Sequence, residues 1–149
     1  MNLTTYGDYA RGLFFLLADR ATIASHTLAV YTVHQTIGIT RGEIVFRSGH
    51  ELRVFEQIDF VAHCILKYSY ELIYDGETQW WYDSMPHPNA PELQSTHPHH
   101  KHVPPGIKQH RIPAPEMSFT RPNLPALIEE VERLAKCSAI EETACRCTR

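Results

Sequence analysis

Apolar residues near the start of the chain recur with the spacing of an amphipathic helix. Within residues 5–22, Tyr9, Leu13, Leu16 and Leu17 fall at helical intervals. In an α-helix such positions share one face, which is buried against another element. The pattern therefore predicts a short amphipathic helix in this segment.

The next part of the chain alternates between apolar and polar positions, as half-buried strands do. In the segment 51–60, Leu52, Val54 and Ile58 fall on one face, and the Asp-Gly pair at 75–76 is typical of a tight hairpin. No proline interrupts this part, which suits strands whose N–H groups donate to a ladder. The pattern predicts five consecutive strands at Thr27–Gln35, Gly42–Arg47, Glu51–Phe60, Ile65–Tyr74 and Thr78–Tyr82.

The last part of the chain has a different pattern. Residues 83–121 carry few strand or helix signals and are predicted to form one long loop. Asn123 is then placed to cap a helix, with Pro125 in its first turn. Residues 137–149 are expected to form a frayed, cysteine-containing tail. An apolar stripe continues to about Cys137 through Leu124, Leu127, Ile128, Val131 and Leu134.

These elements define the fold class α+β, an antiparallel β-meander of about five strands with an N-terminal and a C-terminal helix packed on one face. Because a chain of 149 residues suits one domain with one core, a single domain is expected over residues 1–136. No apolar run approaches the ~20 residues that cross a bilayer, which argues against an integral membrane protein. The first apolar run lacks a basic start and a clear cleavage site, so the cytoplasm is the expected location.

Histidine and proline are distributed unevenly. All ten prolines and six of the ten histidines lie within residues 86–125. This segment carries four Lys or Arg against two Asp or Glu, while the chain as a whole has a net charge of −3. Its positive charge rises further as the histidines protonate. That charge suits a polyanion such as RNA, for which phosphate contacts supply most of the affinity.

The densest group of residues able to do chemistry is the run HPHHKH at 97–102. In an extended chain, neighbouring side chains point to opposite faces, so His100 and His102 would share one face and Lys101 would take the other. The candidate catalytic residues are the histidines of this region and their charged neighbours: His87, His99, His100, His102, Lys101 and Asp83.

Metal-free RNA cleavage is the first hypothesis for these residues. It needs a base that takes the 2′-OH proton and an acid that protonates the leaving 5′ oxygen, and two imidazoles suit both roles. Lys101 would stabilise the phosphate charge, and Asp83 would orient a histidine tautomer. This reaction requires no metal and no other cofactor. The sequence does not say which two of the four histidines act.

Two other hypotheses remain open. A metal-dependent hydrolase could use the same histidines, with Asp83 completing the site. No HExxH or CxxC pattern supports a standard zinc site, and the Cys-Arg-Cys sequence at 145–147 is more simply part of a tail. Alternatively, the histidines belong to an ordinary surface loop, and the protein acts without catalysis by binding a partner.

Three further residues are candidate substrate contacts. Tyr70 could stack on a base, while Arg53 and Lys67 lie on strand positions that could project toward a polyanion. The plainer interpretation is core packing for the tyrosine and an ion-paired, solvated sheet face for the two cations.

Short motifs in the same regions match a known pattern. Residues 67–70 read KYSY, residues 82–83 read YD and are followed by PH at 86–87, and residues 98–103 read PHHKHV before the terminal helix. Over about residues 27–135 the chain resembles the TumE-like toxin family. The resemblance implies a toxin of a prokaryotic type II toxin–antitoxin pair, held in check by an antitoxin from a neighbouring gene. RNA is the substrate we expect, and a homodimer remains open.

The resemblance is incomplete at residues 81–88. Relatives commonly read RYDNAPHH there, whereas this chain reads WYDSMPHP. Trp81 thus takes the place of an arginine, and Pro88 that of a second histidine. If these two residues are catalytic in relatives, His97 or Arg111 is a candidate replacement in this chain.

Overall fold

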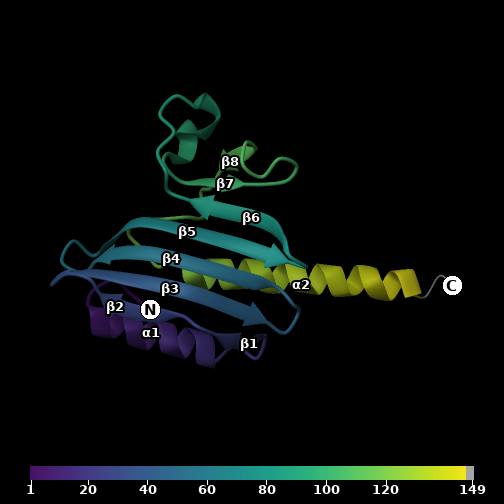
Figure 1. The fold of residues 1–149 in the computed structure, drawn as a ribbon, viewed down its shortest axis with the longest axis horizontal. Helices are drawn as coiled ribbons and strands as arrows, with labels where there is room; N and C mark the ends of the chain where they lie inside the picture. Colours follow the sequence, from purple (N-terminus) through teal and green to yellow (C-terminus); the bar gives the residue numbers. More distant parts are fainter. Residues whose placement is uncertain (147–149) are drawn as a thin grey trace.

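The computed structural model describes residues 1–146, and side chains as far as Cys137. Within this part, eight strands form one antiparallel sheet in the order β1-β3-β4-β5-β6-β7-β8, with β2 also pairing with β3. Figure 1 shows this sheet with helices α1 and α2. The elements are α1 (Tyr6–Ala18), β1 (Ile23–His26), β2 (Ala29–Thr32), β3 (Ile37–Phe46), β4 (Glu51–Asp59), β5 (Cys64–Tyr74), β6 (Glu77–Asp83), η1 (Pro91–Thr96), β7 (His100–His102), β8 (Arg111–Pro113) and α2 (Leu124–Arg146).

The N-terminal helix forms as its apolar pattern predicts. Thr5 caps α1 by accepting a hydrogen bond from the Asp8 N–H, and the Asp8 carboxylate lies in the first turn, where the helix dipole favours it. Tyr9, Leu13 and Leu17 are buried against the sheet. The predicted α+β class with a helix at each end is therefore confirmed.

The predicted count of about five strands is too low, and one reason lies before β3. The predicted strand Thr27–Gln35 contains the shorter strand β2, and a separate short strand, β1, precedes it; both pair with β3. Gly42 in β3 has φ +143°, and a Cβ atom there would lie 2.6 Å from the Thr27 carbonyl oxygen. The backbone at Thr27 thus passes close to Gly42 between the two short strands. The alternation of apolar and polar residues does not predict this contact.

The predicted long loop at residues 83–121 is also wrong in part, because it contains η1, β7 and β8. β7 is three residues long and consists of His100, Lys101 and His102, so it has no apolar alternation to read. β8 ends in Pro113 and lies at the edge of the sheet, where a missing backbone N–H is tolerated. β7 forms by pairing with the edge of β6, and β8 then pairs with β7.

Both helices pack on one face of the sheet, as predicted. α1 contributes Tyr9 and Leu13 to the core and α2 contributes Leu127 and Ile128, where they meet inward-facing residues of the long strands such as Leu52. α2 begins as predicted but continues to Arg146, past the predicted end near Cys137, and extends beyond the sheet (Figure 1). The division into a domain of residues 1–136 and a tail stays a prediction, and residues 147–149 lie outside the described part. No helix within residues 1–146 is long and apolar enough to cross a membrane.

A buried polar network links α1 to the sheet and was not predicted. Glu56 of β4 is fully buried and accepts hydrogen bonds from the hydroxyl groups of Tyr9 and Tyr70, the latter at 2.6 Å. Asn123 donates to the Tyr70 hydroxyl at 3.1 Å, and its Oδ1 accepts from the Ser118 N–H. Asn123 immediately precedes α2 as predicted, and its carbonyl oxygen accepts from the Leu127 N–H at 3.2 Å, while its side chain joins this network.

Candidate functional site

The candidate site lies on the sheet face opposite the two helices. β7 pairs with β6 so that Asp83 stands opposite His100 and Trp81 stands opposite His102. Because opposite residues of an antiparallel pair project to the same face, these four side chains gather together. β8 adds Arg111, which stands opposite His102 on the next strand.

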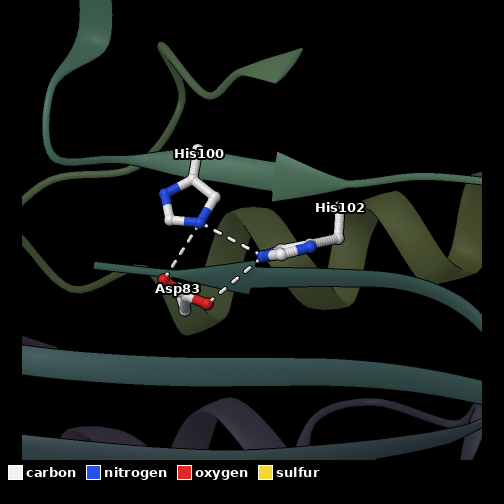
Figure 2. Close-up of side chains that lie close together, drawn as sticks. All are labelled: Asp83, His100 and His102. Atoms are coloured by element: carbon white, nitrogen blue, oxygen red, sulfur yellow. Dashed lines mark hydrogen bonds and ion pairs between the residues drawn. The ribbon is translucent and has the colours of Figure 1, made fainter. Parts of the chain in front are cut away.

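Asp83, His100 and His102 form a compact cluster, drawn in Figure 2. The Nε2 atom of His100 lies 3.1 Å from Asp83 Oδ1 and 3.1 Å from the Nε2 atom of His102. The Nε2 atom of His102 lies 3.4 Å from Asp83 Oδ2. All three residues are buried, with exposed fractions of 8% for Asp83, 1% for His100 and 2% for His102. The expectation that His100 and His102 share one face is confirmed.

Backbone carbonyl groups fix the orientation of both imidazole rings. His100 Nδ1 lies 3.1 Å from the Pro98 carbonyl oxygen, and His102 Nδ1 lies 2.7 Å from that of Ile107. A carbonyl oxygen can only accept, so each Nδ1 carries the proton. In a neutral ring the Nε2 atom then presents its lone pair, and both lone pairs face Asp83.

A third imidazole, His87, packs edge-on against His100, with ring centres 4.8 Å apart. Burial lowers the pKa of His87, and the nearby charge of Arg111 lowers it further. Burial also lowers the pKa of His100, against the opposing effects of the Pro98 carbonyl and Asp83. Both shifts favour the neutral imidazole near neutral pH.

Trp81 forms one side of the cluster. Its ring stacks on His102 with centres 4.4 Å apart and an interplanar angle of 13°. Its indole Nε1 donates to Ser69 Oγ at 2.8 Å, which fixes the ring on the sheet. At the position where relatives commonly have arginine, this chain therefore has an aromatic ring that orients a histidine.

A cavity of about 870 Å³ opens beside the cluster, and Asp83, His87 and His102 belong to its wall. Arg111 also lines it, and its buried Nε has no hydrogen-bond partner among the described residues. Aromatic rings and cationic side chains line much of the rest: Phe55, Trp81, Phe119, Lys67, Lys108 and Arg111.

Several candidate residues lie away from this cavity. Lys101 points to the helix-covered face, where its Nζ donates to Glu130 Oε1 at 2.6 Å. Tyr70 is fully buried on that face and contacts Glu56, so it offers no surface to a substrate. His99 stacks on Tyr68, and burial lowers its pKa.

The two other candidate cations, Lys67 and Arg53, line two different cavities. Lys67 lines the large cavity, with its Nζ 5.7 Å from the centre of the Phe55 ring. Arg53 pairs with Glu71 at 3.4 Å and lines a second cavity of about 380 Å³. Of the nine candidate residues, the cluster and the large cavity bring together Asp83, His87, His100, His102 and Lys67.

Trp81 and Arg111 lie at the site but were not among the nine candidate residues predicted from the sequence. Trp81 falls on the outward face of a predicted strand, and a large aromatic residue there is a signal of a covered or binding surface. Arg111 was a candidate only as a replacement for the arginine of relatives, and the structure places it in the cavity wall. His97, the other candidate replacement, is exposed and is not part of the cluster.

Residues that could hold a metal ion are Asp83, His100 and His102. Among the described residues they form a group whose ligand atoms lie within 4.8 Å of one another. Two imidazoles and one carboxylate are a donor set typical of divalent transition metals.

The fold and the site define a small α+β protein with an imidazole–carboxylate cluster in the wall of a cavity. A family model described as Toxin TumE matches residues 13–135, most of the chain. The chain therefore belongs to the TumE toxin family, which confirms the resemblance seen in its motifs. Membership in this family implies that the chain is the toxin of a toxin–antitoxin system and that a cognate antitoxin is its partner. No curated protein and no solved structure matches the chain.

Proposed function

We propose that this toxin arrests growth by cleaving RNA in the cavity beside Asp83, His100 and His102. The observation that carries the proposal is the presence of imidazoles, cations and aromatic rings in one cavity of about 870 Å³. Cations neutralise phosphates, aromatic rings stack on bases, and imidazoles transfer protons near neutral pH. Single-stranded RNA, which the toxin would meet in the cytoplasm, presents groups that match all three.

RNA binding would use the aromatic and cationic parts of the wall. Trp81 and Phe55 offer ring surfaces to unpaired bases, and Lys67 and Lys108 can neutralise the sugar–phosphate backbone. Arg111 is the candidate for the phosphate that reacts. Its guanidinium group lines the cavity, where its N–H groups would donate to phosphate oxygens, and its Nε–H has no partner among the described residues.

Cleavage itself would use the imidazoles nearest to Arg111. His87 lies in the cavity wall beside His100 and is the candidate to exchange a proton with the 2′ oxygen or the leaving 5′ oxygen. An imidazole of the cluster of Asp83, His100 and His102 would make the second proton transfer, on the other side of the reacting phosphate. Arg111 would stabilise the negative charge that develops on that phosphate.

Expression in bacteria tests the proposal in cells. Induced wild-type protein should stop growth, the neighbouring antitoxin gene should restore it, and sequencing of RNA ends should reveal new cut sites. His87→Ala and Arg111→Met should remove both the arrest and the cuts. His110→Ala is the matched control, because His110 is an exposed histidine of the same segment. Arrest that persists in all variants without new RNA ends would instead support a non-enzymatic toxin.

Purified protein tests the chemistry directly. RNA should be cut, and the cutting should be measured with a chelator and with added divalent metals, since the cavity is compatible with either reaction. Products that carry a 2′,3′-cyclic phosphate would identify attack by the 2′ oxygen. Absence of cleavage under every metal condition, by protein that still arrests growth, would refute the nuclease proposal.

A further inference from the structure

The cluster of Asp83, His100 and His102 contains a hydrogen-bonding conflict. Both Nδ1 atoms face carbonyl oxygens, at 3.1 Å for His100 and 2.7 Å for His102, so the neutral form of each ring has its proton on Nδ1. The two Nε2 atoms are nevertheless 3.1 Å apart and also face the Asp83 carboxylate. Atoms that all carry lone pairs converge on one point, and a cation at that point would resolve the conflict.

The distances match the spacing of ligands around a metal ion. A tetrahedral Zn²⁺ with ligands about 2.0–2.2 Å away holds neighbouring ligand atoms about 3.3–3.6 Å apart. The separations in the cluster are 3.1 Å between the two Nε2 atoms, 3.1 Å from His100 Nε2 to Asp83 Oδ1 and 3.4 Å from His102 Nε2 to Asp83 Oδ2, so each carboxylate oxygen faces one histidine. Little movement is therefore needed to place one ion among the three side chains.

The surroundings hold the three ligands as metal sites commonly do. Histidine ligands usually donate their second N–H to a carbonyl or carboxylate, which fixes the ring and the tautomer. His100 and His102 both do so, and Trp81 also stacks on the ring of His102. The Asp83 carboxylate is fixed by the Met85 N–H, which donates to Oδ1 at 2.8 Å.

From this geometry we infer that Asp83, His100 and His102 bind one divalent first-row transition-metal ion, such as Zn²⁺. Imidazole ligands favour such an ion over Mg²⁺ or Ca²⁺, which prefer oxygen. Three protein ligands leave at least one position open, as in catalytic zinc sites. Asp83 and His102 line the large cavity, so that position is available to water or to a phosphate oxygen.

The inference deepens the proposed function and, for its catalytic part, rests on it. A bound ion at the cavity wall would act as a Lewis acid on the RNA phosphate or on a bound water. The reaction would then be the metal-dependent alternative rather than the metal-free one. Metal binding itself is measurable whether or not the protein cuts RNA.

Metal analysis of the full chain tests the site. Protein freed of metal with a chelator should bind one Zn²⁺ per chain in a calorimetric titration. Bound Co²⁺ should give the visible absorption of a site with nitrogen and oxygen ligands. His100→Ala, His102→Ala and Asp83→Asn should weaken binding at least about 100-fold, because loss of an outer partner alone costs about 10–100-fold. His110→Ala should bind like wild type, and circular dichroism should show that each variant is folded.

The outcomes separate the site from its function. Failure of folded wild-type protein to bind stoichiometric metal would overturn the site, as would wild-type affinity in both folded His100→Ala and His102→Ala. Stoichiometric metal without RNA cleavage would refute the proposed function and leave the site standing. RNA cleavage by protein shown to be metal-free would uphold the nuclease and overturn the catalytic role of the ion.

Discussion

Lys101 and Arg111 show that neighbouring positions on a sheet give cations different roles. Lys101 lies between the two clustered histidines in sequence, but its side chain crosses to the helix-covered face and pairs with Glu130 of α2. Arg111 stands opposite His102 and lines the cavity. Proximity along the chain therefore favours Lys101 as the phosphate ligand, whereas strand register favours Arg111.

Substitution of each cation by methionine should separate these roles. Lys101→Met breaks a half-buried ion pair and should lower the free energy of unfolding by about 1–2 kcal/mol. It should leave RNA cleavage at the wild-type rate. Arg111→Met should lower the cleavage rate by about 100-fold, as expected when a group that stabilises transition-state charge is removed, with a smaller effect on stability. Denaturant unfolding and a cleavage assay on both variants measure the two effects. Loss of cleavage in Lys101→Met with wild-type cleavage in Arg111→Met would instead identify Lys101 as the phosphate ligand.

At the scale of elements, the long strands β4, β5 and β6 were predictable, whereas the short strands β1, β7 and β8 were not. β4 buries Leu52, Val54 and Ile58 on one face, so a period of two is imposed on its sequence. β7 buries His100 and His102 by pairing with β6, and its sequence has no hydrophobic alternation that would predict a strand. A short polar strand forms because a neighbouring strand offers hydrogen bonds. The sequence of the short strand itself does not reveal that neighbour.

The network around Glu56 connects α1, β4 and β5. Its carboxyl group is fully buried and accepts from the hydroxyl groups of Tyr9 and Tyr70. Burial is the main reason that the pKa of Glu56 is raised from 4.5 in the folded protein. The folded state therefore binds a proton on Glu56 at pH values where the unfolded state has released it.

This linkage predicts how stability changes with pH. The contribution of Glu56 is complete below pH 4.5, the value for the unfolded chain, and is lost as the pH rises through the higher folded pKa. The free energy of unfolding should fall over that range by up to about 1.4 kcal/mol per pH unit. Glu56→Gln stays neutral and keeps an acceptor for one tyrosine and a donor for the other, so its curve should lack this decline. Denaturant unfolding of both proteins from about pH 4 to pH 8, with a chelator present, measures the difference. Parallel curves would show that Glu56 is ionised in the fold.

At the scale of the whole molecule, the site was partly predictable. Alternation along an extended segment is enough to place His100 and His102 on one face, and Asp83 ends the preceding strand. The carbonyl groups of Pro98 and Ile107 that orient the rings could not be predicted, because any residue supplies a carbonyl and only the path of the loop brings it close. The same holds for the cavity, which depends on how the proline-rich segment folds over the sheet.

Among the described side chains of the C-terminal helix, those that join the core lie near its start. Within the described side chains, α2 buries Leu127, Ile128 and Val131 in the core, and Glu132 accepts from Arg20 at 2.7 Å. The family match ends at residue 135, close to the end of the predicted domain.

Truncation should therefore have sharply different effects at two positions. A chain of residues 1–137 keeps the contacts between α2 and the sheet described above, so it should unfold within about 1 kcal/mol of the full chain and still arrest growth. A chain of residues 1–123 lacks the helix and exposes one face of the sheet, so it should not fold. Thermal unfolding followed by circular dichroism, together with the growth assay, distinguishes the two. Loss of growth arrest in a folded 1–137 chain would assign a function to residues 138–149 and would place the end of the functional unit beyond the predicted domain.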